Sequence, residues 1–277
     1  MATFGTFVGD YRKLLRAARN IPLGCDSPLQ LPPIRDTVPK VAIFSPHPDD
    51  EVLAGSALAM RLRREGCPVT NVAMTLGSDR VERARRLVEL ERACTYLGFD
   101  VQLLALDGFE SGNEKTHPGW DDMVERVEAF LECGAPSIVI VHHLLDAHPT
   151  HHMTAQLVRT AMRRAKWTGL LFEAEDWSEM SHPNLLVEVS ERDLVYILEA
   201  LSFHKGELVR NPYHIREPGR LSNNVRRSEL VFGKGTQAPE IDFAVLYRRV
   251  ECAKGKMWPV PGKSRFLSTQ NPVTMIL

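Results

Sequence analysis

The amino-acid sequence predicts an α/β fold: a Rossmann-like, doubly wound and mainly parallel sheet with a C-terminal extension that contains β-strands. Apolar runs of strand length alternate with helical patterns between residues 41 and 204. The runs at residues 41–44 and 138–141 are wholly apolar, which is typical of strands buried on both faces of a parallel sheet. A chain of 277 residues has room for one such domain and a short appendage.

The first predicted unit is residues 1–39. It holds one helix over residues 10–19, capped by Asp10, and a proline-rich connector that includes Pro32 and Pro33. We expect this helix to pack on the main domain, although its basic, nearly acid-free opening is also typical of an organelle presequence. The main domain is predicted to span residues 40–277.

Strands and helices then alternate along the main domain. The predicted strands cover residues 41–44, 68–76, 101–106, 137–143, 170–175 and 185–189. The predicted helices cover residues 52–64, 80–97, 119–133, 152–164 and 191–204. The charged residues of the helix at 80–97 indicate a solvated face with pairs such as Glu82 and Arg86. Residues 216–227 are predicted to form an exposed basic loop, and residues 229–232 and 241–250 to form strands added to the sheet.

A cluster of chemically active side chains follows the first apolar run. Pro46 and Pro48 prevent further strand pairing at the point where His47, Asp49 and Asp50 appear. In open α/β sheets, ligands bind at the carboxyl ends of the strands, so position and residue type both indicate a site. Two adjacent carboxylates point in different directions, which allows one to hold a metal while the other transfers a proton.

A second cluster follows the apolar run at residues 138–141. It contains His142 and His143 and then the motif His148-Pro149-Thr150-His151, beside the start of a helix. If both runs are strands of one parallel sheet, their carboxyl ends lie at the same edge. His47, Asp50 and His151 would then share a zinc ion and leave one coordination position for water, as in catalytic zinc sites.

The two motifs resemble those of the zinc-dependent LmbE/PIG-L deacetylase family, which includes deacetylases of N-acetylglucosaminyl-phosphatidylinositol and of mycothiol and bacillithiol synthesis. The family motif Pro-His-Pro-Asp-Asp-Glu stands at residues 46–51, and His-Pro-Asp-His stands at residues 148–151 with Thr150 in place of Asp. Weaker similarity runs from about residue 40 to 210. The resemblance implies that residues 40–277 form a deacetylase domain that removes the acetyl group from an N-acetylglucosamine-like sugar or sugar conjugate.

The resemblance also implies roles for individual residues. Zinc on His47, Asp50 and His151 would polarise the amide carbonyl and acidify a water, from which Asp49 removes a proton. His148, as an imidazolium, would face the developing oxyanion. Either Asp49 or His148 would protonate the departing amine. Weaker candidates for substrate contact are Arg80, Asp107, Asp146 and His204.

Several histidines can also be interpreted as structural residues with no part in the chemistry. His142 and His143 are expected to be hydrogen-bonded core residues, and His204 suits a buried structural role as well as a pocket role. Glu51 fits a helix-capping role, since an acidic residue in the first turn complements the helix dipole.

Composition excludes several classes of function. A net charge of −1 and a pI near 6.8 give no strong field for nucleic acid. The sequence contains neither a run long enough for a membrane helix nor the apolar core of a signal peptide, so a cytoplasmic location is expected. The five scattered cysteines are expected to be free thiols.

Two other functions remain as alternatives. A metal-dependent phosphoester hydrolase also uses His and Asp clusters, usually with two metals. A non-catalytic nucleotide-binding module is less favoured, because no Gly-x-Gly-x-x-Gly motif follows the first strand. The sequence alone specifies neither the substrate nor the oligomeric state.

Overall fold

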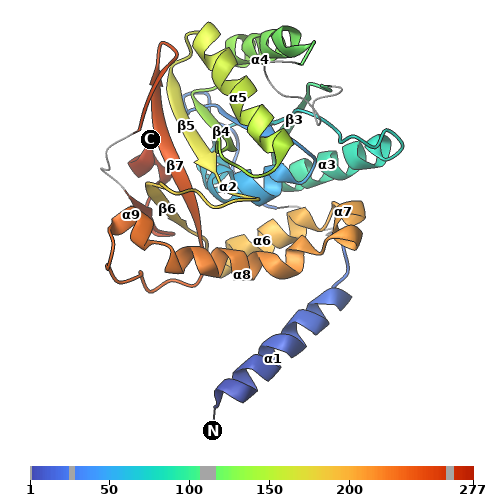
Figure 1. Cartoon of the computed structure of the whole chain (residues 1–277), viewed down its shortest axis with the longest axis vertical. Helices are drawn as coiled ribbons and strands as arrows, with labels where there is room; N and C mark the ends of the chain where they lie inside the picture. The colour runs from blue at the N-terminus through green and yellow to red at the C-terminus, as the bar shows by residue number, and fades with distance from the viewer. Residues whose placement is uncertain (1, 25–28, 107–116, 260–264) are drawn as a thin grey trace.

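The computed structural model describes residues 2–24, 29–106, 117–259 and 265–277. It confirms the predicted α/β class: a mostly parallel sheet lies between two layers of helices (Figure 1). The strands are β1 (Val41–Ser45), β2 (Val69–Ala73), β3 (Asp100–Leu103), β4 (Ile138–His142), β5 (Gly169–Ala174), β6 (Leu185–Glu188), β7 (Ala244–Ala253), β8 (Lys256–Pro259) and β9 (Phe266–Leu267).

The strand order contains one change of direction that matters for function. The sheet runs β3-β2-β1-β4-β5-β7-β6-β9, with β8 paired to β7. From β1 the chain builds β2 and β3 on one side and then returns to place β4 and β5 on the other, all in parallel. The switch point of the fold therefore lies between the carboxyl ends of β1 and β4, where doubly wound sheets bind ligands.

Helices cover both faces of the sheet. They are α1 (Phe4–Ala17), a π-helical turn (Glu51–Gly55) that continues into α2 (Ser56–Arg64), α3 (Arg83–Leu97), α4 (Trp120–Gly134), α5 (Pro149–Arg164), α6 (Glu191–Leu201), α7 (Lys205–Arg210), α8 (Tyr213–Arg226) and α9 (Glu229–Phe232). Short 3₁₀ turns occur at Ala18–Asn20 and Val273–Ile276. Within the described ranges, no helix is both long and apolar enough to cross a bilayer.

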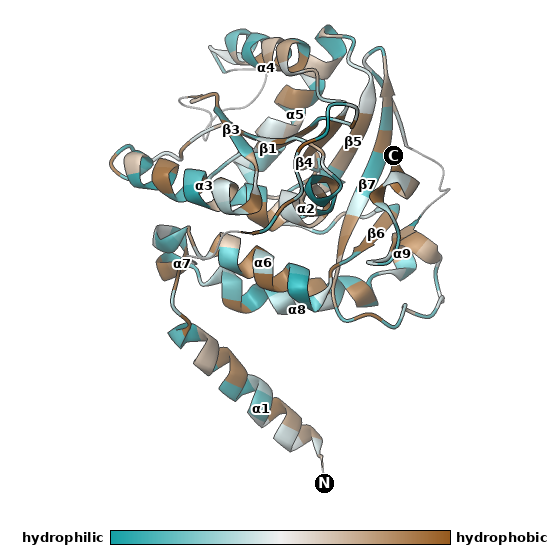
Figure 2. Ribbon diagram, turned by 180° about the vertical axis from the view of Figure 1, so that it is seen from behind, coloured by the Kyte–Doolittle hydropathy of each residue, from teal (hydrophilic) through white to brown (hydrophobic). Residues whose placement is uncertain are grey.

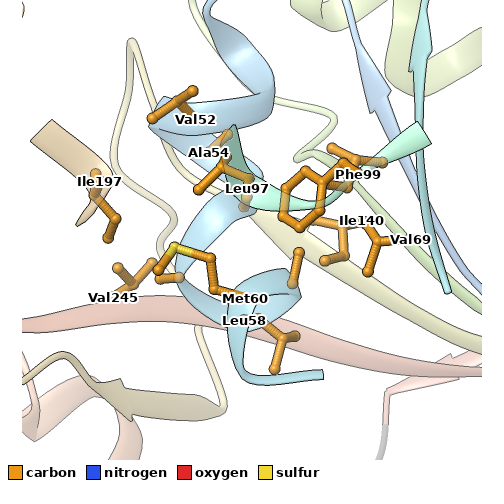
Figure 3. Packing of buried hydrophobic residues seen from close by; sticks show 14 of the residues in the cluster. Val52, Ala54, Leu58, Met60, Val69, Leu97, Phe99, Ile140, Ile197 and Val245 are labelled. Carbon is orange, nitrogen blue, oxygen red and sulfur yellow. The ribbon is translucent and has the colours of Figure 1, made fainter. Parts of the chain in front are cut away.

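The wholly apolar strands bury both of their faces, as predicted. In β1, Val41 and Ile43 join a core formed with α2, α3 and α6, part of which is shown in Figure 3. Ala42 and Phe44 point the other way, into a second core formed with α4 and α5. This alternation is the geometric consequence of a strand's two-residue period. It holds β1 and β4 rigidly at the centre of the molecule.

The N-terminal helix differs from the prediction. It begins at Phe4 and not at Asp10, because Thr3 and Thr6 form a capping box upstream. The expectation that it packs on the main domain is wrong over most of its length. The helix, all of which is described, contains no buried residue, and Figures 1 and 2 show it projecting from the body.

The C-terminal third also departs from the predicted elements. Residues 216–227 are not an exposed basic loop but lie largely in α8, which buries Ile215, Leu221 and Val225 on one side. The guanidinium group of Arg227 is buried because it forms an ion pair with the buried carboxylate of Glu175, at a distance of 2.7 Å. Residues 229–232 form the helical turn α9 and not a strand, while the strand predicted at 241–250 runs from 244 to 253. The described cysteines, Cys67, Cys94, Cys133 and Cys252, are free thiols, as expected.

Candidate metal centre and active site

The switch point brings the two sequence clusters together. The motif after β1 and the motif that opens α5 line one cavity of 380 Å³. A third strand contributes as well, since Asp176 and Trp177 follow the carboxyl end of β5. The lining is His47, Asp49, Asp50, Leu53, Gly77, Ser78, Arg86, His148, Pro149, Thr150, His151, Asp176, Trp177, Glu207, Arg210 and Tyr213.

Asp50 lies between two histidines. Its Oδ2 is 3.2 Å from His47 Nδ1, and its Oδ1 is 3.4 Å from His151 Nε2. The backbone N–H of His47 also donates to Oδ2 at 2.8 Å and fixes the carboxylate. A tetrahedral zinc ion with bonds of about 2.0–2.1 Å separates its ligand atoms by about 3.3 Å. The spacing of these three side chains therefore fits a metal.

Two groups of side chains in the described part of the chain are arranged closely enough to hold a metal, and His151 belongs to both. One group is His47, His148 and His151; the other is Asp50, His142, His151 and Asp176; within each, the ligand atoms lie within 4.8 Å of one another. Nitrogen and carboxylate oxygen ligands suit zinc and related divalent ions. Because His151 is shared, the two groups surround overlapping positions at one centre.

His142 was predicted to be a hydrogen-bonded core histidine, and this prediction is wrong. It is 1% exposed, yet neither ring nitrogen has a hydrogen-bond partner among the described residues. Its Nε2 lies 3.7 Å from Asp50 Oδ1, and its ring centroid is 4.0 Å from that of His151. His143 does meet the expectation, because its Nε2 is 2.9 Å from the carbonyl oxygen of Ser178.

The charges of the centre reinforce one another. Burial alone would raise the pKa of Asp50, but His151 and His47 outweigh burial and hold it well below its usual range. Burial alone would lower the pKa of His151, but Asp50 and Asp146 outweigh it and raise that pKa to about 8. Burial and the nearby His151 lower the pKa of His142 to about 3. The opposite charges of Asp50 and His151 therefore stabilise each other at the centre.

Asp146 was a candidate for substrate contact, but the structure places it behind His151 and not on the cavity wall. Its Oδ1 is 3.3 Å from His151 Nδ1 and accepts the backbone N–H of His148 at 2.9 Å. Its Oδ2 accepts the N–H of Trp177 at 3.1 Å. A carboxylate on the distal nitrogen of a ligand histidine orients the ring and increases its basicity. Asp146 therefore supports the centre from behind.

Asp49 has an unusual backbone conformation. Its φ is 118°, a region that non-glycine residues rarely adopt. Its N–H donates to Glu51 Oε2 at 2.9 Å, and its carbonyl accepts the N–H groups of Val52 and Leu53, both at 3.0 Å. Burial, followed by the charges of Asp50 and Glu51, raises the pKa of its carboxyl group well above the usual value. The chain thus keeps a strained residue with a basic carboxylate on the cavity wall.

Glu51 and His204 form a buried pair beneath Asp49. The Nε2 of His204 lies 2.7 Å from Glu51 Oε1, and both side chains are essentially inaccessible. Because Glu51 also accepts the N–H of Asp49, the carboxylate links His204 to the strained residue. His204 is absent from the cavity lining, so the geometry favours its structural role over the predicted substrate contact. Glu51 supports Asp49 in addition to opening the π-helical turn.

His148 is the N-terminal cap of α5. Its Nδ1 accepts the backbone N–H of Thr150 at 3.3 Å, while its ring lies 5.0 Å from that of His47 between centroids. Burial, with the neighbouring charges of His151 and His47, lowers the pKa of His148 to about 4. This differs from the expected imidazolium. With Nδ1 accepting a hydrogen bond, the neutral ring carries its proton on Nε2.

The arginine that was predicted to contact substrate does not line the cavity. Arg80 is exposed and absent from the lining, whereas Arg86, which we expected on a solvated face, lines the cavity. Arg86 lies 3.5 Å from Glu207, and Glu82 pairs with Arg85 in place of Arg86. The other predicted substrate contact, Asp107, lies outside the described residues.

Sequence reasoning missed Asp176, Trp177 and Tyr213 on the cavity. Burial and the charge of Asp50 raise the pKa of Asp176 to about 7. Asp176 could have been found from the sequence, because it lies two residues after β5, whose carboxyl end is at the same edge of the sheet as those of β1 and β4. Tyr213 begins α8, a helix that the sequence pattern concealed.

A mostly parallel α/β sheet with a cluster of His and Asp side chains at its switch point defines a candidate metal centre. Residues 42–162 match the model of the PIG-L family, described as GlcNAc-PI de-N-acetylase. The match confirms the resemblance predicted from the two motifs. A search of curated proteins finds no significant match.

Solved structures share the fold. The N,N′-diacetylchitobiose deacetylase from Pyrococcus horikoshii is 16% identical, with 92% of this chain and 94% of that chain covered and a TM-score of 0.60. The zinc-inhibited form of a teicoplanin deacetylase is 15% identical, with 81% and 100% covered and a TM-score of 0.57. The 4-carboxy-2-hydroxymuconate hydratase from Pseudomonas putida is 16% identical, with 82% and 99% covered and a TM-score of 0.62. At these identities the likeness shows the fold alone, and the fold hosts more than one reaction.

Proposed function

We propose that this protein is a zinc-dependent N-deacetylase that hydrolyses the acetamide of an N-acetylglucosamine-like sugar or sugar conjugate and releases acetate and a free amine. One observation carries the proposal: His47, Asp50 and His151 converge at one point, and Asp49 and His148 line the same cavity. The family match supports the reaction, and the chitobiose deacetylase of similar fold supports the substrate class.

The metal would be held by His47, Asp50 and His151. When bound, the ion supplies Lewis-acid chemistry, because it polarises a carbonyl group and makes a water molecule more acidic. Asp146 holds the ring of His151 from behind, and the backbone N–H of His47 holds the carboxylate of Asp50. These contacts pre-organise the ligands, so little rearrangement is needed when the metal binds.

Asp49 would act as the general base. Its carboxylate accepts a proton from the water that attacks the amide carbon, and its raised pKa makes it a stronger acceptor near neutral pH. The same residue, now protonated, donates that proton to the amine nitrogen as the C–N bond breaks. Neutral His148 cannot do this without first gaining a proton, so we assign both transfers to Asp49.

His148 would stabilise the developing charge on the carbonyl oxygen. In its neutral form the ring donates through Nε2–H, since Nδ1 is engaged by Thr150. A neutral donor is more useful here than a cation, because a second positive charge beside the metal would weaken metal binding. The donor is pre-oriented by the helix cap and by the ring of Trp177, 5.3 Å away between centroids.

The substrate would enter between Trp177 and Tyr213. The side chain of Trp177 is 58% exposed at the cavity, which suits stacking against one face of a sugar ring. A second cavity of 270 Å³ adjoins the first and shares Leu53, Asp176, Trp177 and Tyr213 with it. The combined space is in the usual range for small-molecule sites and accommodates a substrate larger than a monosaccharide.

The test is metal analysis combined with product analysis. Protein reconstituted with excess zinc and then dialysed is incubated with N-acetylglucosamine, N,N′-diacetylchitobiose and N-acetylated pseudodisaccharides and thiol glycosides, and in parallel with a phosphomonoester and an unsaturated dicarboxylic acid. Acetate and primary amine are measured together with bound zinc. We expect both products in equal amounts, one zinc per active chain, and loss of activity on chelation. Phosphate release by protein that requires two metals would favour the phosphoester alternative. Addition of water to an unsaturated acid without acetate release would favour a hydratase.

A further inference from the structure

The projecting helix α1 carries an apolar stripe that nothing in the described part of the chain covers. Phe4, Phe7, Val8, Tyr11 and Leu14 recur at helical spacing and therefore share one side of the helix. Their exposed fractions run from 49% for Tyr11 to 91% for Phe4. A concentrated set of exposed large apolar side chains on one element marks an interaction surface.

The stripe adjoins a complementary apolar groove. A cavity of 830 Å³ lies between the C-terminal half of α1 and the helices α6 and α8. On the α1 side its walls include Leu14, Leu15 and Ala18, and on the body side they include Leu198 and Ile215. The N-terminal half of the stripe does not reach this groove, because none of Phe4, Phe7 and Val8 lines it and the straight helix leads away from the body (Figures 1 and 2).

We propose that the groove is filled by α1 of a second copy of this chain. The two α1 helices would lie antiparallel across a two-fold axis, so that Phe4, Phe7 and Val8 of each copy enter the groove of the other. Antiparallel pairing places the N-terminal half of one helix against the C-terminal half of its counterpart, where each groove lies. The contact is reciprocal, as the interface of a closed two-fold dimer must be.

The exposed area suits such a dimer. Exposed fractions of 91%, 68% and 49% for Phe4, Phe7 and Tyr11 correspond to about 400 Å² of aromatic surface, since an aromatic side chain presents roughly 200 Å². Covering this surface on both copies, together with the groove wall that faces Phe4 and Phe7, removes about 1,450 Å² from water, which is within the range of specific stable interfaces.

The first experiment measures mass in solution by sedimentation and by light scattering on full-length protein. We expect the wild type to have twice the 31.2 kDa chain mass at micromolar concentration. Phe4→Ser combined with Phe7→Ser should weaken dimerisation by at least about tenfold. The matched control, Val81→Ser with Val209→Ser, changes side chains that are 87% and 82% exposed elsewhere and should leave the dimer intact. Wild type that stays monomeric at tens of micromolar, or an unaffected double variant, overturns the proposal.

A second experiment tests the antiparallel register. Tyr11 would lie beside its counterpart at the two-fold axis, so Tyr11→Cys in a Cys133→Ser, Cys25→Ser background should form an interchain disulfide under mild oxidation. Lys13→Cys, on the opposite side of the helix, should not. Equal cross-linking of both variants, or of neither, contradicts this arrangement. Monomeric wild type that sediments with phosphatidylglycerol vesicles but not with phosphatidylcholine vesicles would assign the stripe to a membrane surface in place of a second copy.

Discussion

Asp49 and Asp50 are neighbours in sequence, yet the fold gives their carboxylates opposite properties. Asp50 faces His47 and His151, which keep it ionised. Burial, followed by the charges of Asp50 and Glu51, raises the pKa of Asp49, so its carboxylate is the more basic of the two. Paired titratable groups with divergent pKa values are typical of acid–base sites. We therefore propose that Asp50 binds the metal and that Asp49 transfers the proton.

This division predicts different outcomes for conservative substitutions. His47→Ala, Asp50→Ala and His151→Ala should each weaken metal binding, because each removes a ligand atom. Asp49→Asn should retain the metal and lower kcat by about a hundred- to ten-thousandfold, the usual contribution of a general base. Metal content after dialysis and kcat at saturating zinc are the measurements. If Asp49→Asn empties the site while Asp50→Asn leaves it filled, the two roles are reversed.

His148→Ala should depress the chemical step without loss of zinc. Removing one donor to an oxyanion lowers kcat by about a hundred- to a thousandfold. Because the pKa of His148 lies near 4, the residue stays neutral across the working range, and the shape of the pH–rate profile above pH 6 should not change. The profile is compared between wild type and variant at saturating zinc. An alkaline limb that disappears in the variant would show that His148 acts as a cation.

Metal affinity should depend on pH through His151. With a pKa of about 8 in the metal-free protein, His151 is protonated at pH 7 and must lose that proton before its nitrogen can bind a metal. Affinity should therefore rise as the pH increases from 6 toward 8 and then level off, and binding at pH 7 should release a proton. Calorimetry in buffers with different ionisation enthalpies measures the release. A pH-independent affinity over this range would contradict the assignment of His151 as a ligand.

At the scale of the element, the junction between β1 and α2 determines where the proposed base lies. The turn after β1 places Asp49 at positive φ, and the π-helical turn that follows directs its N–H toward Glu51. π-helical turns within helices often occur at functional sites. The Glu51–His204 pair connects this junction to α7, because His204 immediately precedes that helix. Glu207 of α7 lines the cavity.

Glu51→Ala should damage both stability and catalysis. The change leaves the ring of His204 and the N–H of Asp49 buried without their partner, and removing one member of a buried pair costs about 3–5 kcal/mol. Since Asp49 loses its support, kcat should fall more than KM, while metal content at saturating zinc is retained. Urea unfolding and steady-state kinetics are the measurements. Glu82→Ala, which breaks an exposed pair with Arg85, is the control and should cost less than about 1 kcal/mol.

At the scale of the whole molecule, we propose that the N-terminal segment divides near residue 21, inside the unit predicted at residues 1–39. Leu23, Leu29 and Val38 pack against the central core. The connector is also tied by hydrogen bonds, because Arg35 donates its N–H to Gly66 at 3.0 Å and Arg63 donates to Pro32 at 2.8 Å. Helix α1, in contrast, buries no residue along its described length.

Two truncations test this division. Removal of residues 1–20 should change the free energy of unfolding of the monomer by less than about 1 kcal/mol, since no buried side chain is lost. Removal of residues 1–39 should lower it by several kcal/mol, because burying one large aliphatic side chain contributes roughly 1.5–3 kcal/mol. Unfolding is followed at a concentration low enough to keep the chain monomeric. Equal loss in both truncations would show that α1 stabilises the domain.

The sequence by itself determined the central strands of this protein and the edge of the sheet at which its two motifs meet. The wholly apolar runs at residues 41–44 and 138–141 predicted strands buried on both faces, because a strand's two-residue period leaves no polar face for water. Parallel order then placed the motifs that follow them at one edge of the sheet. The family resemblance rests on the same local motifs, so it too follows from the order of residues along the chain.

Only the tertiary structure decided the partners of each side chain. The basic residues between positions 216 and 227 suggested an exposed loop, but Arg227 pairs with Glu175, a residue distant in sequence. Arg86 and not Arg80 lines the cavity, and the buried His142 lies beside Asp50 at the candidate metal centre without a hydrogen-bond partner among the described residues. Local sequence governs period and strand ends, whereas burial and ion pairing depend on contacts between distant segments, which form only when the chain has folded.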